Sequence, residues 1–263
     1  MMLSTGFAST TQAVEIEKAT SSRSARDESL QAMPWRELSP DQHAAASYVV
    51  KNTSIYRRLP KQQVTCDPQM YSFLLKHPEV IVNLWEVMGV GMITLDRVND
   101  VSFRCVDGQG TACNIHVLHG TPHLQMIYAE GVYEGPMFRK PLKGRCLILL
   151  RNEYHKDRSG NYVVTSTLDS FIHLERTSIE LIAKTFQPLI GKVADFNFSE
   201  TMYFVSSLSH TASKNPSGVA RVSRRLERVE PNVRDEFARV SLAVGERATA
   251  SRPAEGVRQA STR

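Results

Sequence analysis

The chain has 263 residues, of which 41% are hydrophobic, and this composition supports a globular core. It has no run of about 18 apolar residues and no basic segment followed by an apolar one near its start, which excludes the usual signatures of a spanning helix and of a secretory signal. The net charge of +5 lies at one end, because residues 214–263 carry eleven Lys and Arg against six Asp and Glu. Residues 1–213 are therefore neutral, and no basic bias predicts nucleic-acid binding there.

The first 40 residues are rich in Ser, Thr and Ala and show no apolar periodicity, so we predict a disordered N-terminal segment over 1–40. A first helix is predicted from Asp41 to Asn52, because Ser39-Pro40-Asp41 provides capping chemistry. The predicted domain covers 41–213, with its core in about 60–213.

A strand and two short helices are predicted next. The strand, Gln62 to Cys66, stops at Asp67-Pro68, where Asp is a favourable N-cap and proline suits the first helical position. The first helix runs to Lys76. The second, Pro78 to Met88, has apolar residues at helical spacing, including Trp85, and ends at two glycines.

After Gly91 the apolar period changes from 3.6 to 2, which predicts strands separated by Asn, Asp, Gly and Pro turns. Short connections predict an antiparallel meander, and the longest one, 131–142, is the expected mobile loop. The six predicted strands are Met92 to Asp96, Ser102 to Asp107, Thr111 to His119, His123 to Glu130, Lys143 to Tyr154 and Tyr162 to Leu174.

Beyond Leu174 the helical period returns and continues to Leu208, with a kink or split predicted near residue 190 by Pro188 and Gly191. Residues 218–229 form a possible short amphipathic helix, and the rest of 214–263 is predicted to be a basic, mostly disordered tail. The apolar side of that short helix carries Val219, Val222, Leu226 and Val229, and the residues around it are Arg221, Arg224, Arg225 and Arg228.

This element order resembles the START and Bet v 1-like (SRPBCC) helix-grip superfamily, with the look of a bacterial-type member. The residues that carry the resemblance are Val64-Thr65-Cys66-Asp67-Pro68, then Tyr71, Phe73 and Leu74, then His77-Pro78-Glu79 and Trp85. The resemblance covers roughly 60–213. It implies an α+β fold in which a curved antiparallel sheet of about seven strands grips a long C-terminal helix, with two short helices after the first strand. It also implies a gap between helix and sheet that superfamily members use for lipids, sterols, polyketides or aromatic compounds. The Phe186-Gln187-Pro188 interruption departs from a single unbroken last helix and leaves the shape of such a gap open.

Polar and aromatic residues near the predicted pocket mouth are the candidate ligand contacts. Asp169 and His173 fall on the face of the last strand opposite its apolar residues, so we expect them on a solvated face or at the cavity rim, where an acid and a histidine are suited to acid–base work. Aromatic groups beside carboxylates at the mouth would orient a ligand's polar head. The predicted ligand-binding residues are Trp85, His116, Tyr128, Tyr133, Glu134, Asp169 and His173.

A metal site is weighed at Cys113, His116, His119 and His123, but strand alternation puts residues 113 and 116 on opposite faces. No metal and no cofactor is therefore predicted. The four cysteines are interpreted as reduced thiols in a cytoplasmic protein, with zinc or disulfide use as the alternative.

The leading functional hypothesis is a noncatalytic module that binds an apolar small molecule or lipid between the sheet and the last helix. One alternative is an enzyme of the same superfamily, a hydrolase or cyclase type. Another is a filled-core interaction protein that acts through its basic tail. The four arginines of 221–228 are candidates for contact with an anionic membrane surface or a protein, and no specific nucleic acid is predicted.

Overall fold

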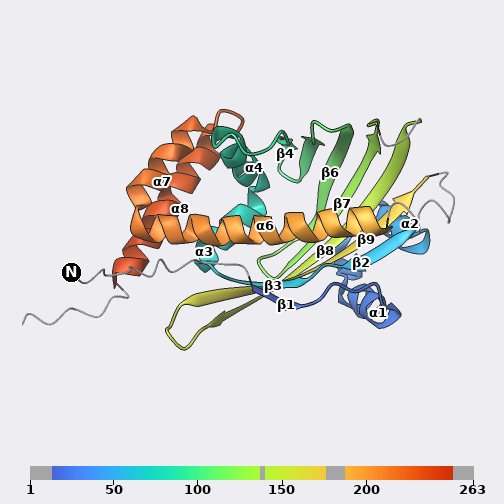
Figure 1. Ribbon diagram of the computed structural model, residues 1–263, viewed down its shortest axis with the longest axis horizontal. Coiled ribbons are helices and arrows are strands. Elements are labelled where there is room, and N and C mark those ends of the chain that lie inside the picture. Colours follow the sequence, from blue (N-terminus) through green and yellow to red (C-terminus); the bar gives the residue numbers. More distant parts are fainter. Residues whose placement is uncertain (1–13, 137–139, 176–186, 251–263) are drawn as a thin grey trace, which may run out of the picture.

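The computed structural model describes residues 14–136, 140–175 and 187–250, which form an α+β fold around one antiparallel sheet (Figure 1). The sheet has nine strands in the order β1-β3-β9-β8-β7-β6-β5-β4, and β2 also pairs with β9. The predicted α+β class with a large curved antiparallel sheet is confirmed, and β1 and β2 are additional to the seven predicted strands. The strands are β1 (Val14–Glu17), β2 (Ile55–Arg58), β3 (Lys61–Thr65), β4 (Thr94–Asn99), β5 (Ser102–Val106), β6 (Thr111–Gly120), β7 (Leu124–Tyr133), β8 (Leu142–Lys156) and β9 (Tyr162–Leu174).

Tight turns join β4 to β5, β5 to β6, β6 to β7 and β8 to β9, as the turn residues predict. The connection between β7 and β8 is longer, residues 134–141, and 137–139 lie outside the described residues. In the β5–β6 turn, Asp107 Oδ1 accepts hydrogen bonds from the backbone N–H groups of Gln109 and Thr111, at 2.7 and 2.8 Å. Gly108 and Gly110 of that turn have φ of 69° and 111°, a region that favours glycine. The turns fix the register, so alternate residues of each strand face the same side of the sheet.

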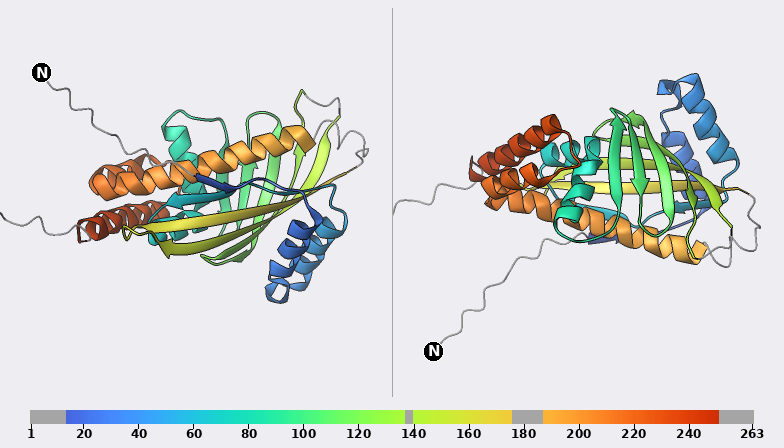
Figure 2. Two further views of the ribbon diagram at one scale, coloured as in Figure 1. Left: turned by 60° about the horizontal axis from the view of Figure 1, so that its bottom comes forward. Right: turned by 90° about the horizontal axis from the view of Figure 1, so that it is seen from above.

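The register defines two faces of the sheet. Cys146, Ile148 and Leu150 of β8 lie opposite Ile172, Ser170 and Leu168 of β9, and we call the side that they share the inner face. The opposite side is the outer face. Helices cover both of them, with α6 on one and α1 and α2 on the other (Figure 2).

Two helices follow β3, as predicted: α3 (Pro68–Lys76) and α4 (Pro78–Val87). Asp67 caps α3, since its Oδ1 accepts hydrogen bonds from the backbone N–H groups of Gln69 and Met70 at 2.9 and 3.1 Å. The proline that begins each helix fits the first turn, where no N–H is needed. The two helices pack their apolar sides into the main core with Val64 and Val164 of the sheet.

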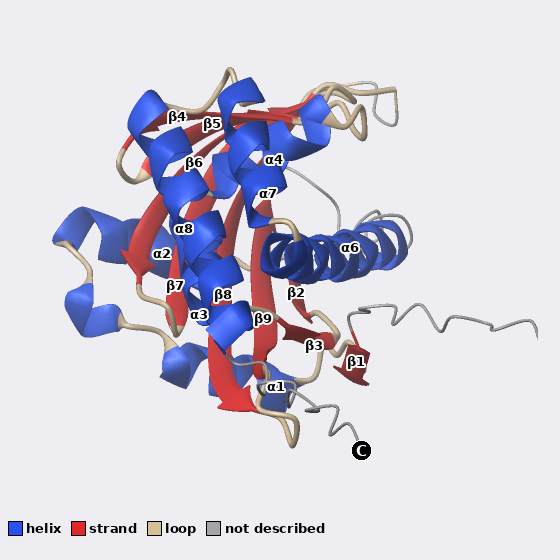
Figure 3. Ribbon diagram, turned by 90° about the vertical axis from the view of Figure 1, so that its left-hand side faces the viewer, coloured by secondary structure: helices blue, strands red, loops and turns tan. Residues whose placement is uncertain are grey.

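The long helix α6 (Gln187–Lys214) runs along the inner face and is seen nearly end-on in Figure 3. Two hydrogen bonds hold it to the end of β3: Ser206 Oγ donates to Thr65 O at 2.7 Å, and Ser209 Oγ accepts from Asp67 N at 2.9 Å. From Gln187 onward it is one helix without the predicted split, because Pro188 falls in the first turn. The part of the predicted helix before residue 187 lies outside the described residues. Neither α6 nor any other described helix has the length and apolarity needed to cross a membrane.

Helices α1 (Arg23–Ala32) and α2 (Pro40–Lys51), joined through the short 3-10 turn η1 (Trp35–Glu37), cover the outer face. Ala46 and Val49 of α2 are fully buried there in a second apolar core with Phe171 of β9. The prediction of a disordered N-terminal segment is wrong for β1, α1 and η1, whereas residues 1–13 lie outside the described residues. The segment has few apolar residues of its own, and its order comes from contacts with distant parts of the chain, which include β3, Arg58 and Arg151.

The chain after α6 forms a helical hairpin of α7 (Pro216–Val222), the 3-10 turn η3 (Ser223–Arg225) and α8 (Pro231–Ala250). The prediction of a single helix over 218–229 is wrong, because α7 ends at Val222 and η3 follows it. The apolar residues predicted there are buried in the main core at Val219, Leu226 and Val229. The prediction of disorder is wrong for 231–250, and residues 251–263 lie outside the described residues. Phe237 of α8 is fully buried and stacks on Phe73 of α3 with 5.7 Å between ring centroids.

Candidate binding cavity

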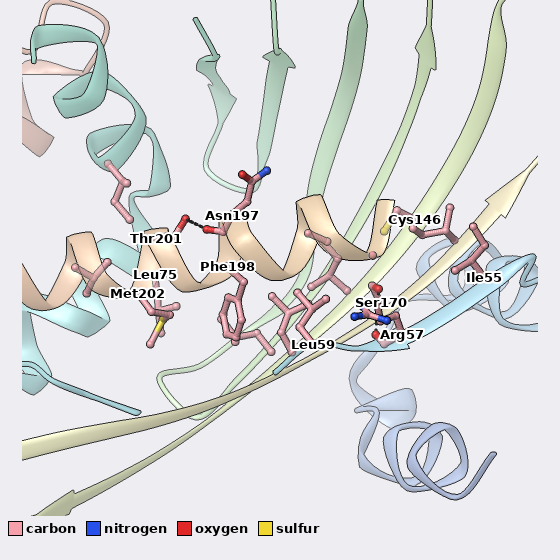
Figure 4. A pocket seen from close by; sticks show the side chains of 18 of the residues that line it. Ile55, Arg57, Leu59, Leu75, Cys146, Ser170, Asn197, Phe198, Thr201 and Met202 are labelled. Carbon is pink, nitrogen blue, oxygen red and sulfur yellow. Dashed lines mark hydrogen bonds between the residues drawn. The ribbon is translucent and has the colours of Figure 1, made fainter. Parts of the chain in front are cut away.

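A half-enclosed cavity of about 420 Å³ lies between α6 and the inner face of the sheet (Figure 4). We call it the inner cavity. The sheet contributes every second residue of β8 and β9, and α6 contributes residues spaced by three or four positions, so both walls follow from the ordinary periods of strand and helix. Its principal apolar lining residues are Ile55, Leu59, Leu74, Leu75, Ile81, Ile148, Leu150, Leu168, Ile172, Ala194, Phe198, Met202 and Val205.

Charge enters the lining of the inner cavity through Arg57 of β2, which is paired with Asp195 of α6. Arg57 Nε donates to Asp195 Oδ1 at 2.9 Å, and Nη2 contacts Oδ2 as well, so the pair is bidentate. Gly191 makes room for it, since a Cβ at that position would lie 3.2 Å from the Arg57 guanidinium carbon. The pair joins helix to sheet and leaves the guanidinium already engaged.

Two of the uncharged polar side chains of the lining, those of Tyr71 and Ser170, are also engaged. Tyr71 Oη donates to Asn152 Oδ1 at 2.9 Å and lies 2.8 Å from Ser166 Oγ, and burial raises the pKa of Tyr71. Ser170 Oγ donates to the backbone oxygen of Arg57 at 3.1 Å. These groups therefore offer little to a ligand's polar atoms, and the cavity suits an apolar body.

Cys146 of β8 contributes a thiol to the lining of the inner cavity. Burial raises the pKa of its thiol to about 12, with the nearby Cys113 adding to the rise. The thiol is therefore protonated at neutral pH and is a poor nucleophile. All four cysteines are free thiols.

The predicted site residues lie elsewhere. Trp85 packs edge-on against Phe204 of α6, with 5.7 Å between centroids, and is not among the lining residues. Tyr133 and Glu134 lie at the end of β7, where the Glu134 N–H donates to Gly110 O at 2.8 Å. This contact joins the start of the β7–β8 connection to the β5–β6 turn.

His116 and Tyr128 come together, but on the outer face of the sheet. They are directly opposite each other on β6 and β7, and their rings stack at 6.4 Å between centroids. His116 Nδ1 lies 2.9 Å from Ser102 Oγ, and Tyr128 Oη donates to Glu130 Oε2 at 2.8 Å. Burial raises the pKa of Tyr128 to about 12, and the hydrogen bond with Glu130 contributes.

Asp169 is fully buried, so the expectation of a solvated or rim position is wrong. The strand face was predicted correctly, because Asp169 points away from the inner cavity. The residue is buried because α1 covers the outer face of the sheet at this point. Tyr56 Oη and Arg58 Nε donate to its Oδ1 at 2.7 and 2.8 Å, and Arg151 Nη2 donates to its Oδ2 at 3.0 Å.

Glu28 of α1 completes this outer-face ion-pair network, the name that we use for Glu28, Tyr56, Arg58, Arg151 and Asp169. Arg151 Nη1 and Arg58 Nη1 donate to Glu28 at 2.8 and 2.9 Å. These hydrogen bonds, from Arg151 first and then Arg58, lower the pKa of Glu28 to about 2. The network joins α1 to β2, β8 and β9, and this role is structural.

His173 belongs to the same outer face, half-buried under α2. Its Nδ1 lies 2.8 Å from the backbone oxygen of Asn52, and its ring meets that of Tyr48 edge-on at 5.3 Å. Asp169 and His173 therefore do not converge on the inner cavity.

No protein-family model and no curated relative matches the chain.

The histidines weighed for a metal site are engaged separately. His119 Nδ1 lies 2.9 Å from Glu37 Oε2 of η1, and His123 Nδ1 lies 3.2 Å from Asn152 O. Within the ranges that the structure describes, no three His, Cys, Asp or Glu side chains gather in a way that would hold a metal ion.

Sequence reasoning missed the Arg57–Asp195 pair and most of the cavity wall. The signals were present: Leu168 and Ile172 mark the apolar face of β9, and Phe198, Met202 and Val205 mark the apolar side of α6. The apolar periods of strand and helix direct these residues toward the core, and the structure shows that they line the inner cavity.

Proposed function

We propose that the chain is a helix-grip protein of the START/Bet v 1-like (SRPBCC) type that binds an apolar small molecule or lipid in the inner cavity. The observation that carries this proposal is the cavity of about 420 Å³ between α6 and the sheet, with an almost wholly apolar lining. This volume is within the range of about 300 to 1,000 Å³ of small-molecule sites. The element order, with two short helices after β3 and a long helix after β9, supports it.

The lining also narrows the ligand's chemistry. Arg57 is paired with Asp195, and Tyr71 with Asn152. A polar group of a ligand buried between them would therefore have to compete for hydrogen-bond partners that are already satisfied. An uncharged hydrocarbon or ring system gains from burial without that competition. The enzymatic alternative gains no support from the cavity, because neither Asp169 nor His173 lines it.

Native mass spectrometry of the full chain, incubated with a total lipid extract, tests the proposal. We expect a mass shift from one bound apolar molecule. The variant Ala194→Phe places a large ring in the cavity and should abolish the shift. Its matched control, Val193→Phe, adds the same ring at a neighbouring position of α6 that is 51% exposed, and should retain it. A clean ligand-free mass for the wild-type chain across all lipid classes, or equal binding by the two folded variants, would contradict the proposal.

A further inference from the structure

An uncharged loop with three exposed apolar side chains connects α4 to β4. Its sequence is Met-Gly-Val-Gly-Met, residues 88–92, and Met88, Val90 and Met92 are 60%, 51% and 69% exposed. We call it the apolar loop. Isolated exposed apolar residues are ordinary, but three in five positions without a charge form a patch of the kind that marks an interaction site.

Backbone geometry holds the first half of this loop in place. Gly89 has φ of 72°, its N–H donates to Glu86 O at 3.0 Å, and the Val90 N–H donates to Trp85 O at 2.9 Å. This pair of hydrogen bonds is the Schellman arrangement, which ends a helix with a glycine in the left-handed region. A Cβ built on Gly89 or Gly91 would meet no atom within 4 Å, so the loop is open to solvent at these two positions, whereas Met92 lies beside Gly108 of the β5–β6 turn.

An arginine-rich segment lies beside α4 and β4, the two elements that the apolar loop connects. Arg228 Nη2 donates to Asp96 Oδ2 of β4 at 2.6 Å, and the hydrogen bond with Asp96 raises the pKa of Arg228, with the nearby Glu86 of α4 contributing. In Figure 1 the connection between α7 and α8 passes next to α4. The C-terminal end of α4 and the segment after α7 are therefore neighbours.

Two buried apolar residues hold the arginine-rich segment against the main core. Leu226 and Val229 are 0% and 2% exposed, because they are buried in the main core. Arg224 and Arg225, which precede Leu226 in the chain, are exposed to solvent. Residues 221–228 carry four Arg against one Glu. Arg228 is already paired with Asp96, so Arg221, Arg224 and Arg225 are the exposed arginines of this segment that remain for an anionic surface.

We propose that the apolar loop and residues 221–228 together form a docking surface for an anionic lipid bilayer. Apolar side chains next to exposed cations match the interface of such a bilayer, where the side chains enter the acyl boundary and the cations meet the headgroups. A protein partner is disfavoured by size, since a stable protein interface buries about 1,200 to 2,000 Å² and a five-residue loop supplies a small part of that. The proposal stands independently of what the inner cavity binds.

Vesicle co-sedimentation of the full chain tests it, with vesicles of phosphatidylcholine alone and with about one third phosphatidylglycerol. We expect binding to the anionic vesicles that is at least tenfold tighter than to the neutral ones and that weakens in high salt. Val90→Asp should lower the affinity at least tenfold, because it puts a charge where the apolar side chain enters the bilayer. Arg224→Glu with Arg225→Glu should lower binding to the anionic vesicles in particular.

The matched control is Val98→Asp, which makes the same change at a 63% exposed valine near the other end of β4. It should bind vesicles as the wild-type chain does. Absence of binding to anionic vesicles, or equal losses in the folded Val90→Asp and Val98→Asp variants, would overturn the proposal. It would also be overturned by light scattering that shows a dimer which Val90→Asp dissociates, because the loop would then be a contact between copies of the chain. Ala194→Phe should leave vesicle binding unchanged, which separates this test from that of the inner cavity.

Discussion

Replacement of Asp169 by Asn is expected to destabilise the protein strongly without touching the inner cavity. The carboxylate is 0% exposed and accepts hydrogen bonds from Tyr56, Arg58 and Arg151. Asn keeps the size but removes the charge, and it presents an amide N–H₂ to one of the donors. The variant therefore leaves Arg58, whose side chain is 11% exposed, without its buried counter-charge.

Removal of one member of a buried ion pair costs about 3 to 5 kcal/mol, because the remaining charge stays desolvated. Arg151 is 25% exposed and Glu28 still faces both arginines, so part of the loss is recovered and we expect a value near the lower end, about 3 kcal/mol. A change of that size lowers the melting temperature by about 6 to 12 °C in a chain of this length.

Urea unfolding followed by circular dichroism measures the free energy, with Asp96→Asn as the matched control. Asp96 makes an equally close pair with Arg228, but its side chain is 45% exposed, so its loss should cost less than about 1 kcal/mol. If Asp169→Asn lowered the free energy of unfolding no more than Asp96→Asn does, burial would not determine the strength of the outer-face ion-pair network. The structural role given to the network would then be wrong.

Two further predictions concern the segments at either end of the fold. Glu28→Gln should lower stability by up to about 1 kcal/mol at pH 7, since the side chain is 56% exposed. Because the pKa of Glu28 falls from 4.5 to about 2 in the fold, this contribution is complete above about pH 4.5 and disappears as the pH falls through about 2. Urea titrations of both proteins should converge over that range, and a constant difference would contradict the pairing. Phe237→Ala should cost about 3 to 5 kcal/mol because the ring is fully buried against Phe73, whereas Leu242→Ala, at a 41% exposed position of the same helix, should cost less than about 1 kcal/mol in the same assay. Equal losses of stability in Phe237→Ala and Leu242→Ala would mean that α8 does not unfold together with the core.

Periodicity and turn chemistry predict the centre of the fold well. Helices α2, α3 and α4 and strands β4 to β9 occur within a few residues of their predicted bounds, because each carries a local signal such as the Asp67 cap or the Asp107 turn. β2 was harder to predict, since its four residues are half basic and its order comes from pairing with β9.

The helices at the two ends show why composition misleads. In α8, Val233, Phe237, Val240 and Val244 follow helical spacing, so the signal was there, but the Ala, Arg, Ser and Glu around them favour a prediction of disorder. In α1 the signal is weak: Ala25 and Ser29 are its buried residues, and neither is a large apolar group. Ion pairs from Glu28 to Arg58 and Arg151 hold α1 on the sheet in place of the large apolar contacts that its sequence lacks.

The candidate site was the least predictable part. Strand alternation correctly puts Asp169 and His173 on the face opposite Leu168 and Ile172. It cannot show that a second layer of helices covers that face, and so it treats buried structural groups as rim residues. His116 and Tyr128 do meet, as residues opposite each other on paired strands, but on the side away from the inner cavity.

The outer-face ion-pair network also has a consequence for the order of folding. Its contacts join Arg58 to Asp169 and Glu28 to Arg151, across 111 and 123 positions of the chain. During synthesis α1 leaves the ribosome long before β8 and β9 exist, so Glu28 can meet Arg58 early, but Arg151 and Asp169 are missing until most of the sheet has been made. Such separations give a high contact order, which slows the search for native pairings. We therefore expect the first helices to dock late, after the hairpins of the meander, and until then the outer apolar core stays open to chaperones.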